Sequence, residues 1–505
     1  MADKFYITTS IAYVNGKPHI GFAMEVIQAD VVARFRRLKG DDVHYQTGTD
    51  EHGMKLVQTA KEQGITPQEL ADKNAEKYKA LKELLNLDFD YFIRTTDDYH
   101  KKAAQKLWGK LVESDDIYTN SYEGLYCVGC EAFVLEKDLV EGKCPNHGKE
   151  PEKLKEENFF FKLSKYNDQI HSLIESDELK IIPESRKHEI LALTKEGLKD
   201  VSFSRPKSVL PWGVTVPGHE DQVMYVWCDA LSNYITGVGY LDEDEQFKKY
   251  WPCDLHLIGK DILRFHAAIW IGMLISAGVD LPKSIAVHGF ITSEGKKMSK
   301  TMNNVVDPAQ YTEKYGIDPL RYYLLKEIPT TGDGDFSKER FHSLYDSDLA
   351  HNIGNLVSRV LSMNEKYFDA KVPDTDKSEG EFAEKLSGIW KTYEEAIDEF
   401  DLRKGLEQAS TLADFANKYI DDTKPWELAK NDEEDLKKVM YVLLEILRHI
   451  ALLLLPYLPG TAEEILRRLG SEAKGDFEKL TSWGILEAGT KTEKGEPLFK
   501  PVEFE

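Results

Sequence analysis

Residues 4–40 read KFYITTSIAYVNGKPHIGFAMEVIQADVVARFRRLKG, and this stretch decides the fold. Its first six residues are β-prone, and a polar loop rich in turn residues follows them. Apolar residues then recur at helical spacing, and Gly40 stands where a C-terminal cap belongs. The stretch predicts a strand, a loop and a helix that begins near Gly21.

The same alternation continues further along the chain. Residues 43–46 and 285–291 predict strands, residues 255–258 predict a strand followed by helix 261–277, and a strand at 223–227 leads into a helix. Strands that alternate with helices are typical of a doubly wound parallel sheet. We therefore predict an α/β fold with a Rossmann-type sheet.

The character of the sequence changes twice. Residues 116–222 lack the alternation and are richer in Gly, Cys and Tyr at their start, whereas strand signals almost vanish after residue 340. The prediction is a sheet in two halves, 1–115 and 223–340, split by an insertion at 116–222 and followed by an all-helical domain at 341–505.

Length and charge restrict the class of protein. The chain has 505 residues, enough for two to four domains, and a net charge of −23 from 88 acidic and 65 basic residues. This charge argues against a general nucleic-acid binder but leaves room for a local basic path. The most apolar stretch, 439–458, contains three polar residues and predicts a core helix rather than a membrane span. No secretory signal is visible, and we expect a soluble, cytoplasmic protein.

Four soft ligands have the spacing of a zinc site. Cys127 and Cys130 form one pair, Cys144 and His147 form a second, and neighbouring Gly, Pro and Asn residues supply the turns such knuckles need. Four ligands leave no open coordination position, so we predict one structural zinc ion within 127–147. The alternative is that the cysteines are small buried apolar residues.

Two further motifs suit phosphate binding. His19 and Gly21 stand at the expected start of the first helix, where free N–H groups and the helix dipole attract an anion. Lys297 and Lys300 follow the last predicted strand on a Gly-containing loop and suit a polyphosphate. Taken alone, His19 at a loop–helix junction is better explained as a helix cap or a satisfied surface group, and the lysines are better explained as a solvated charge run.

Together, these motifs resemble those of class I aminoacyl-tRNA synthetases. HIGF at 19–22 is similar to the HIGH signature apart from its last residue, and KMSKT at 297–301 nearly matches the KMSKS signature. Finer matches resemble the methionyl-tRNA synthetase family, in its branch with a single zinc knuckle. They are AYVNG at 12–16, TGTDEHG at 47–53, YVWCDA at 225–230, GKD at 259–261, FH at 265–266 and HG at 288–289.

The resemblance implies a set of site residues. For catalysis these are His19, Gly21, Lys297 and Lys300, and for ATP they also include Phe22, Gly259, Asp261, Met298 and Ser299. Asp50 would hold the methionine amino group, and the methionine pocket would consist of Ile11, Tyr13, Trp227, Ala230, Tyr234, Ile262 and His266. A thioether favours polarizable aromatic walls, and an ammonium favours a carboxylate. Without the resemblance, Trp227 and Tyr234 are better interpreted as plain core residues.

The helical domain resembles the family's anticodon-binding domain. Asn355 and Arg359 are four residues apart, so they share one helix face and suit splayed bases, while Trp426 suits base stacking. The alternatives are a surface ion pair for Arg359 and core packing for Trp426.

The resemblance implies ATP-dependent attachment of L-methionine to tRNA(Met) through methionyl-adenylate, with Mg²⁺ accompanying ATP, for translation initiation and elongation. We expect a monomer, because the chain ends soon after the helical domain. Three alternatives stay open: a class I synthetase for another amino acid, a small nucleotidyltransferase, and a non-catalytic tRNA-binding paralogue. Phe22 makes the last conceivable, but we predict an active enzyme in which Phe22 packs against the nucleotide or the helix start.

Overall fold

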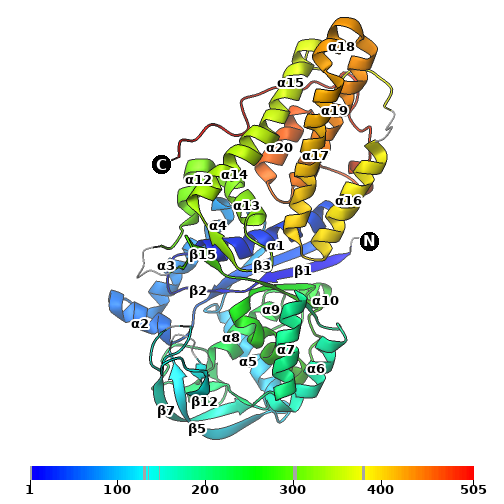
Figure 1. Cartoon of the computed structure of the whole chain (residues 1–505). Helices are drawn as coiled ribbons and strands as arrows, with labels where there is room; N and C mark the ends of the chain where they lie inside the picture. The colour runs from blue at the N-terminus through cyan, green and yellow to red at the C-terminus, as the bar shows by residue number, and fades with distance from the viewer. Residues whose placement is uncertain are drawn as a thin grey trace.

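A computed structural model describes residues 3–128, 132–134, 136–146, 148–298, 304–377 and 382–504. Figure 1 shows three tiers: a helical bundle at the top, a parallel sheet with its helices in the middle, and an antiparallel sheet at the bottom.

The central sheet has seven strands, and all of its neighbouring strands are parallel. The strand order is β2-β3-β1-β13-β14-β8, with β4 beside β3. The predicted Rossmann-type sheet is therefore confirmed. The bounds are β1 Lys4–Thr9, β2 Ala12–Tyr13, β3 Asp42–Asp50, β4 Tyr91–Arg94, β8 Lys180–Ile182, β13 Leu255–Gly259 and β14 Ser284–His288.

Helix α1 (Ile20–Leu38) crosses from β1 to β3 and is buried along most of its length. It packs on β1 and β3 on one side and on α13 (Ile317–Lys326) on the other, so its N-terminus is held at the edge where the strands end. The other helices around the sheet are α2 Met54–Gln63, α3 Pro67–Lys79, α4 Leu81–Leu84, α5 Asp98–Glu113, α8 Val226–Leu231, α9 Asn233–Thr236, α10 Glu245–Tyr250 and α11 Ile271–Ala277.

The segment between the two halves of the sheet forms antiparallel sheets. One has the order β6-β5-β7-β9, and the other has the order β10-β12-β11. Two helices, α6 (Asn167–Glu175) and α7 (Glu184–Glu196), accompany them. The strands are β5 Ile117–Cys127, β6 Ala132–Val134, β7 Glu152–Phe161, β9 Val201–Ser202, β10 Ser204–Pro206, β11 Thr215–Val216 and β12 His219–Met224.

Two details of the sequence prediction are wrong here. The strand expected near 223–227 is β12, and it belongs to a small antiparallel sheet rather than to the parallel one. Its first three residues are exposed, as one solvated face of an antiparallel sheet allows. Conversely, β8 lies inside the range 116–222 but pairs with β14, so this segment returns one strand to the central sheet.

A three-stranded sheet and three helices connect the central sheet to the bundle. The strands are β15 (Ile291–Ser293), β16 (Lys296–Lys297) and β17 (Gly334–Phe336), so strands continue beyond the last one predicted at 285–291. The helices are α12 Pro308–Tyr315, α13 and α14 Lys338–Leu344.

The helices that remain lie between residues 345 and 480, and the described residues 481–504 that follow them are irregular. A π-helical stretch at Tyr345–Gly354 runs into α15, and the bundle consists of α15 Asn355–Phe368, α16 Phe382–Asp398, α17 Leu402–Thr423, α18 Pro425–Asn431, α19 Glu433–Leu454, α20 Pro459–Arg468 and α21 Phe477–Leu480.

Helix α19 is the core helix expected from the apolar stretch at 439–458. Its polar residues Glu445, Arg448 and His449 are buried with it, and Arg448 Nε donates to Glu445 Oε2 at 2.8 Å. Across the described parts of the chain, none of the helices is long and apolar enough to cross a membrane.

Candidate active site

The predicted site residues gather where the parallel strands end. β1 is followed by Ile11 and by β2, which ends at Tyr13, while β3 ends at Asp50 and β13 ends at Gly259. Parallel strands direct their carboxyl ends to one edge of the sheet, which is where ligands bind in doubly wound folds. The topology therefore brings these segments to one edge.

His19 caps the N-terminus of α1. Its backbone is extended, and its Nδ1 accepts a hydrogen bond from the Gly21 N–H at 3.1 Å. In the neutral ring, Nε2 then carries the proton and is a donor. A Cβ on Gly21 would lie 3.0 Å from the His19 ring, so glycine is what lets the ring fold over the helix start.

Phe22 lies in the first turn of α1 and is buried. Its ring meets Tyr78 of α3 edge-on, with a centroid distance of 5.3 Å. The ring thus packs against protein at the helix start, as one of the two predicted placements requires, and its contact with ATP stays a prediction.

An aromatic cluster forms where α8 and α9 meet the chain after β13. Trp227 is stacked on Phe265 at 4.1 Å with nearly parallel rings, and it meets His266 edge-on at 6.1 Å. The structure therefore brings together Trp227, Tyr234, Ile262 and His266, while Ala230 is buried on α8. Phe265 was not among the predicted pocket residues, although it adjoins His266 in sequence.

The hydrogen bonds of His266 define its chemical state. Nδ1 lies 3.0 Å from the Ile262 carbonyl oxygen, which can only accept, and Nε2 lies 2.6 Å from the Tyr234 hydroxyl. Burial lowers the pKa of His266 to about 4, although its bond to the Ile262 carbonyl acts in the opposite direction. The ring is therefore neutral at pH 7, with its proton on Nδ1. A neutral, aromatic-walled site suits an uncharged thioether.

Tyr13 and Asp50 are partners in the sheet. They pair directly between β2 and β3, and Tyr13 Oη accepts from the Leu56 N–H at 3.1 Å. Ile11 is partly buried just before β2. The predicted amino-group ligand and one predicted wall of the methionine pocket are thus neighbours.

A buried Asp–His–His cluster beside these residues escaped prediction. Asp229 accepts from His52 Nδ1 at 2.6 Å and from His100 Nε2 at 2.8 Å, and all three side chains are almost fully buried. Burial alone would raise the pKa of Asp229, but its electrostatic interaction with His52 and the hydrogen bonds from both rings lower it to about 2. Asp229 is therefore ionised, and it ties helix α8 to the loop after Asp50.

A second buried pair joins the N-terminal half of α1 to the end of β14. Glu25 accepts from Ser10 Oγ at 2.6 Å and from His288 Nε2 at 2.7 Å. Burial alone would lower the pKa of His288, but the hydrogen bond and the charge of Glu25 give a net increase. Its Nδ1 also faces an acceptor, the Gly289 carbonyl, so the protonated ring satisfies both partners. A Cβ on Gly289 would lie 2.2 Å from the Gly332 oxygen, which requires glycine there.

The predicted ATP residues beyond α1 are only partly described. Gly259 is buried at the end of β13, and Asp261 is exposed in the turn that follows. Lys297 belongs to β16, Met298 is partly buried after it, and Ser299 and Lys300 lie outside the described residues, as does the side chain of Lys297.

The hairpin that leads to Lys297 is well defined. β15 and β16 are joined by Glu294 and Gly295, both with positive φ, as a type I′ turn requires. Asp335 anchors the turn by accepting from the Gly295 N–H at 2.8 Å. The hairpin therefore fixes the backbone position of Lys297.

Two of the four predicted zinc ligands are described. Cys127 ends β5 and Cys144 lies in a tight turn closed by a 2.8 Å hydrogen bond from Gly148 N–H to the Cys144 carbonyl, and both side chains are buried. Cys130 and His147 lie outside the described residues. Within the described ranges, no group of three or more His, Cys, Asp or Glu is placed to hold a metal ion.

The predicted anticodon residues lie on α15 and α18, two helices that Figure 1 shows in the upper part of the bundle. Asn355 is exposed at the start of α15, and Arg359 reaches Asn417 and Asp421 of α17 at 3.4 and 3.5 Å. Trp426 is 41% exposed on α18, which excludes core packing for its ring.

Comparison with known proteins adds the family context. The model of tRNA synthetases class I (M) matches residues 5–153 and 146–361, and the model of the anticodon binding domain of methionyl tRNA ligase matches residues 372–505.

Curated relatives cover the chain from end to end. The methionine–tRNA ligase of Thermotoga maritima is 44% identical over 508 residues, covering 99% of this chain and 80% of that protein. The Bacillus subtilis ligase is 43% identical over 524 residues, covering 100% and 78%.

Solved structures share the fold. Mycobacterium tuberculosis methionyl-tRNA synthetase in complex with methionyl-adenylate has a TM-score of 0.93 and 40% identity, covering 99% of this chain and 100% of that one. The apo form of that enzyme has a TM-score of 0.89 and 36% identity, with coverages of 100% and 99%.

Proposed function

Because the chain belongs to the methionyl-tRNA synthetase family of class I aminoacyl-tRNA synthetases, we propose that it attaches L-methionine to tRNA(Met) at the expense of ATP. The observation that carries this proposal is the full-length similarity to a synthetase solved with methionyl-adenylate. The neutral His266 beside Trp227 and Tyr234 supports it, since such a site suits methionine's uncharged side chain.

The reaction has two steps at one site. A methionine carboxylate oxygen attacks the α-phosphorus of MgATP, and the bond to pyrophosphate breaks. A ribose hydroxyl at the tRNA 3′ end then attacks the carbonyl carbon of the adenylate, and AMP leaves. Since the substrates supply every reacting group, the protein contributes positioning and charge stabilisation.

Named residues would share that work. His19 would donate from Nε2 toward the phosphates beside the N-terminus of α1, and the charges of Lys297 and Lys300 would stabilise the same phosphates. Asp50 holds the ammonium group of methionine, and Asn355, Arg359 and Trp426 contact the anticodon.

A structural zinc ion fits the donors at 127–147. Thiolates and imidazole are the ligands zinc prefers, and the buried thiols of Cys127 and Cys144 are suited to a closed site. The ion, when bound, would hold the small antiparallel subdomain together. Cys130 and His147 would complete the set.

The division into 1–115, 116–222, 223–340 and 341–505, the monomeric state and a cytoplasmic location are also part of the proposal. Light scattering of the purified protein tests the monomer against a mass of 57.7 kDa.

Amino-acid-dependent ATP–pyrophosphate exchange tests the function and separates the alternatives. We expect exchange with methionine and far less with other amino acids. Exchange driven by another amino acid would indicate a different synthetase, and exchange with no amino acid would indicate a nucleotidyltransferase. Binding of tRNA without any exchange would indicate a non-catalytic paralogue.

A further inference from the structure

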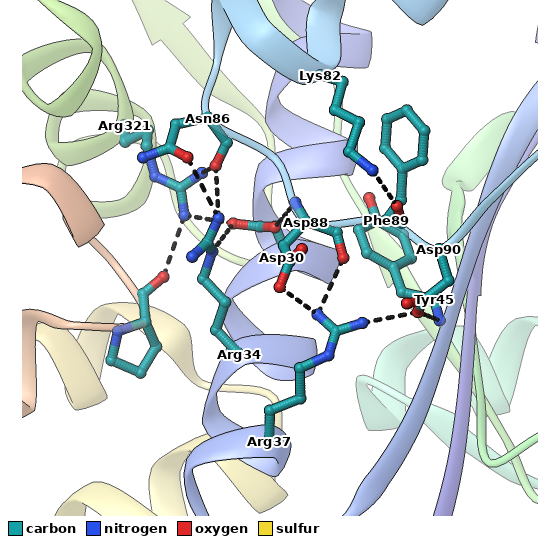
Figure 2. Close-up of polar contacts among 11 residues, drawn as sticks. Asp30, Arg34, Arg37, Tyr45, Lys82, Asn86, Asp88, Phe89, Asp90 and Arg321 are labelled. Carbon is teal, nitrogen blue, oxygen red and sulfur yellow. Dashed lines mark hydrogen bonds and ion pairs between the residues drawn. The ribbon is translucent and has the colours of Figure 1, made fainter. Parts of the chain in front are cut away.

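Arg321 is a buried cation at the junction between the helical bundle and the rest of the chain. It lies on α13, and neither its side chain nor that of Asp30 on α1 has any exposed surface. Arg321 Nη2 donates to Asp30 Oδ2 at 2.7 Å. Figure 2 shows the two side chains and the polar groups around them. Because both are fully buried, neither can touch a substrate.

The other donors of Arg321 reach two further segments. Nε donates to the Tyr457 carbonyl at 2.7 Å and Nη2 to the Pro456 carbonyl at 3.0 Å, while Nη1 donates to the Leu85 carbonyl at 3.1 Å. Pro456 and Tyr457 form the connection between α19 and α20, inside the match to the anticodon binding domain, whereas Arg321 lies in the match to the synthetase. One guanidinium therefore ties the bundle to α1.

Asp30 has partners that do not depend on Arg321. Its Oδ1 accepts from the Asp88 N–H at 2.7 Å, and its Oδ2 also accepts from Arg34 Nε at 2.8 Å. Arg34 Nη2 donates in turn to the Asn86 carbonyl at 2.8 Å. These bonds, visible in Figure 2, hold α1 against the 86–88 segment even without a bridge to the bundle.

Helix α13 makes a second buried link to the bundle. Asp318, three residues before Arg321, accepts from the Thr461 N–H of α20 at 2.5 Å and is 7% exposed. The same helix thus presents one anionic and one cationic side chain to the α19–α20 corner. Both links hold the α19–α20 corner of the bundle against α13.

We propose that Arg321 is a positioning residue for the charging of tRNA. It fixes the orientation of the helical domain relative to α1, and hence the span between the anticodon-binding end and the active site. The role of a buried ion pair is better sought in fixing one arrangement than in net stability, because desolvation offsets much of its attraction. This inference rests on the proposed function, since only a tRNA held at both ends depends on that span.

The test compares the two half-reactions in Arg321→Lys. Lysine keeps the charge beside Asp30 but lacks the planar fork that reaches Tyr457, Pro456 and Leu85 together. We expect pyrophosphate exchange to keep its kcat and its KM for methionine and ATP, because adenylate formation does not use the bundle. The kcat of tRNA charging should fall by about 10-fold or more, since small displacements of a reacting end are costly.

Two further variants sharpen the result. Asp318→Ala removes only a contact to α20, and we expect the same selective loss of charging. Lys326→Ala is the matched control: it lies on the same helix and pairs with Glu407 of α17 at 3.1 Å, but that pair is partly exposed. We expect both half-reactions of Lys326→Ala to match wild type.

Equal losses of exchange and charging in Arg321→Lys would overturn the inference, because Arg321 would then support the catalytic fold as a whole. Unchanged charging would overturn it as well. Failure of the proposed function itself would be seen separately, as a wild-type protein without methionine-dependent exchange.

Discussion

The Tyr234 hydroxyl donates a hydrogen bond to Nε2 of His266 over 2.6 Å, and this direction is fixed because Nδ1 of the same ring donates to the Ile262 carbonyl. Two bonds thus hold a buried imidazole in one tautomer. Because the His266 ring is neutral and its Nε2 already accepts a hydrogen bond from Tyr234, it presents no charge to the pocket.

The first prediction concerns pH. The pKa of His266 is lowered from 6.5 to about 4 in the folded protein, so only the unfolded chain binds a proton there as the pH falls through this window. The free energy of unfolding should be intact above pH 6.5 and decrease toward pH 4, by up to about 3 kcal/mol from this group.

Urea unfolding of wild type and His266→Gln between pH 7 and pH 4 checks this. The variant should lose less stability than wild type over the window. Parallel curves for the two proteins would show that His266 does not titrate as described.

The second prediction concerns Asp229. In Asp229→Asn, the amide N–H₂ would face an imidazole N–H, and a buried charge partner would be lost, at a cost of about 3–5 kcal/mol. Because Asp229 joins α8 to the loop after Asp50, the KM for methionine should rise more than the KM for ATP.

Thermal unfolding and steady-state exchange measure both effects. Glu243→Gln serves as the control, since Glu243 forms an exposed pair with Lys106 that is worth about 0–1 kcal/mol. An Asp229→Asn protein as stable as wild type would refute the role of the cluster.

The third prediction separates the two roles of His19. His19→Ala loses both the helix cap and the Nε2 donor, whereas His19→Asn keeps a good capping side chain. Both variants should lower the rate of adenylate formation by about 10²–10³, the usual effect of losing one transition-state donor.

Only His19→Ala should also lower the melting temperature. Presteady-state adenylate formation and differential scanning calorimetry measure the two quantities. Normal adenylate formation in His19→Asn would assign the residue to capping alone.

The fourth prediction concerns metal. Wild-type protein should contain one zinc ion per chain, and Cys144→Ser should lose it together with the order of the 127–147 segment. Cys253→Ser is the control, because Cys253 is a buried thiol that contacts the Tyr6 carbonyl far from this segment in sequence. Elemental analysis decides: wild-type protein without stoichiometric zinc rules the site out.

The fifth prediction concerns Trp426. Because the ring is 41% exposed, Trp426→Ala should cost less than the ~3–5 kcal/mol typical of truncating a fully buried Trp. Loss of stacking on a base should raise the KM for tRNA by about 5-fold or more, at about 1–3 kcal/mol per base.

Exchange, which needs no tRNA, should be unaffected. Val112→Ala, at a residue 51% exposed on α5, is the control for surface truncation and should leave the KM for tRNA unchanged. An unchanged KM for tRNA in Trp426→Ala would remove this residue from the interface.

Local sequence patterns predict most of the fold. Helix α1 follows from helical periodicity, β1 and β3 follow from β-prone stretches within residues 4–50, and the parallel direction of the strands follows from the alternation of strands and helices. Strand β8 has only three residues, too short for any period, and β12 pairs within an antiparallel sheet that no local signal specifies. Pairing between distant segments is decided by tertiary packing, which a single sequence does not display.

The candidate site shows the same difference between local motifs and contacts made by distant residues. His19 and Trp227 lie in contiguous motifs, so sequence alone could single them out. His52 and Asp229 also lie in such motifs, at 47–53 and 225–230, but no local pattern shows that they meet each other and His100 until the fold places two imidazoles against one carboxylate. Contacts of this kind need a structure.

The most direct test of the central claim is the charging of purified tRNA(Met) by the purified wild-type protein, followed as acid-precipitable radioactive methionine. With ATP present, methionine should accumulate on the tRNA, and a tRNA with an altered anticodon should be charged much more slowly. Absence of methionyl-tRNA under these conditions, with the tRNA intact and a known synthetase able to charge it, would contradict the account.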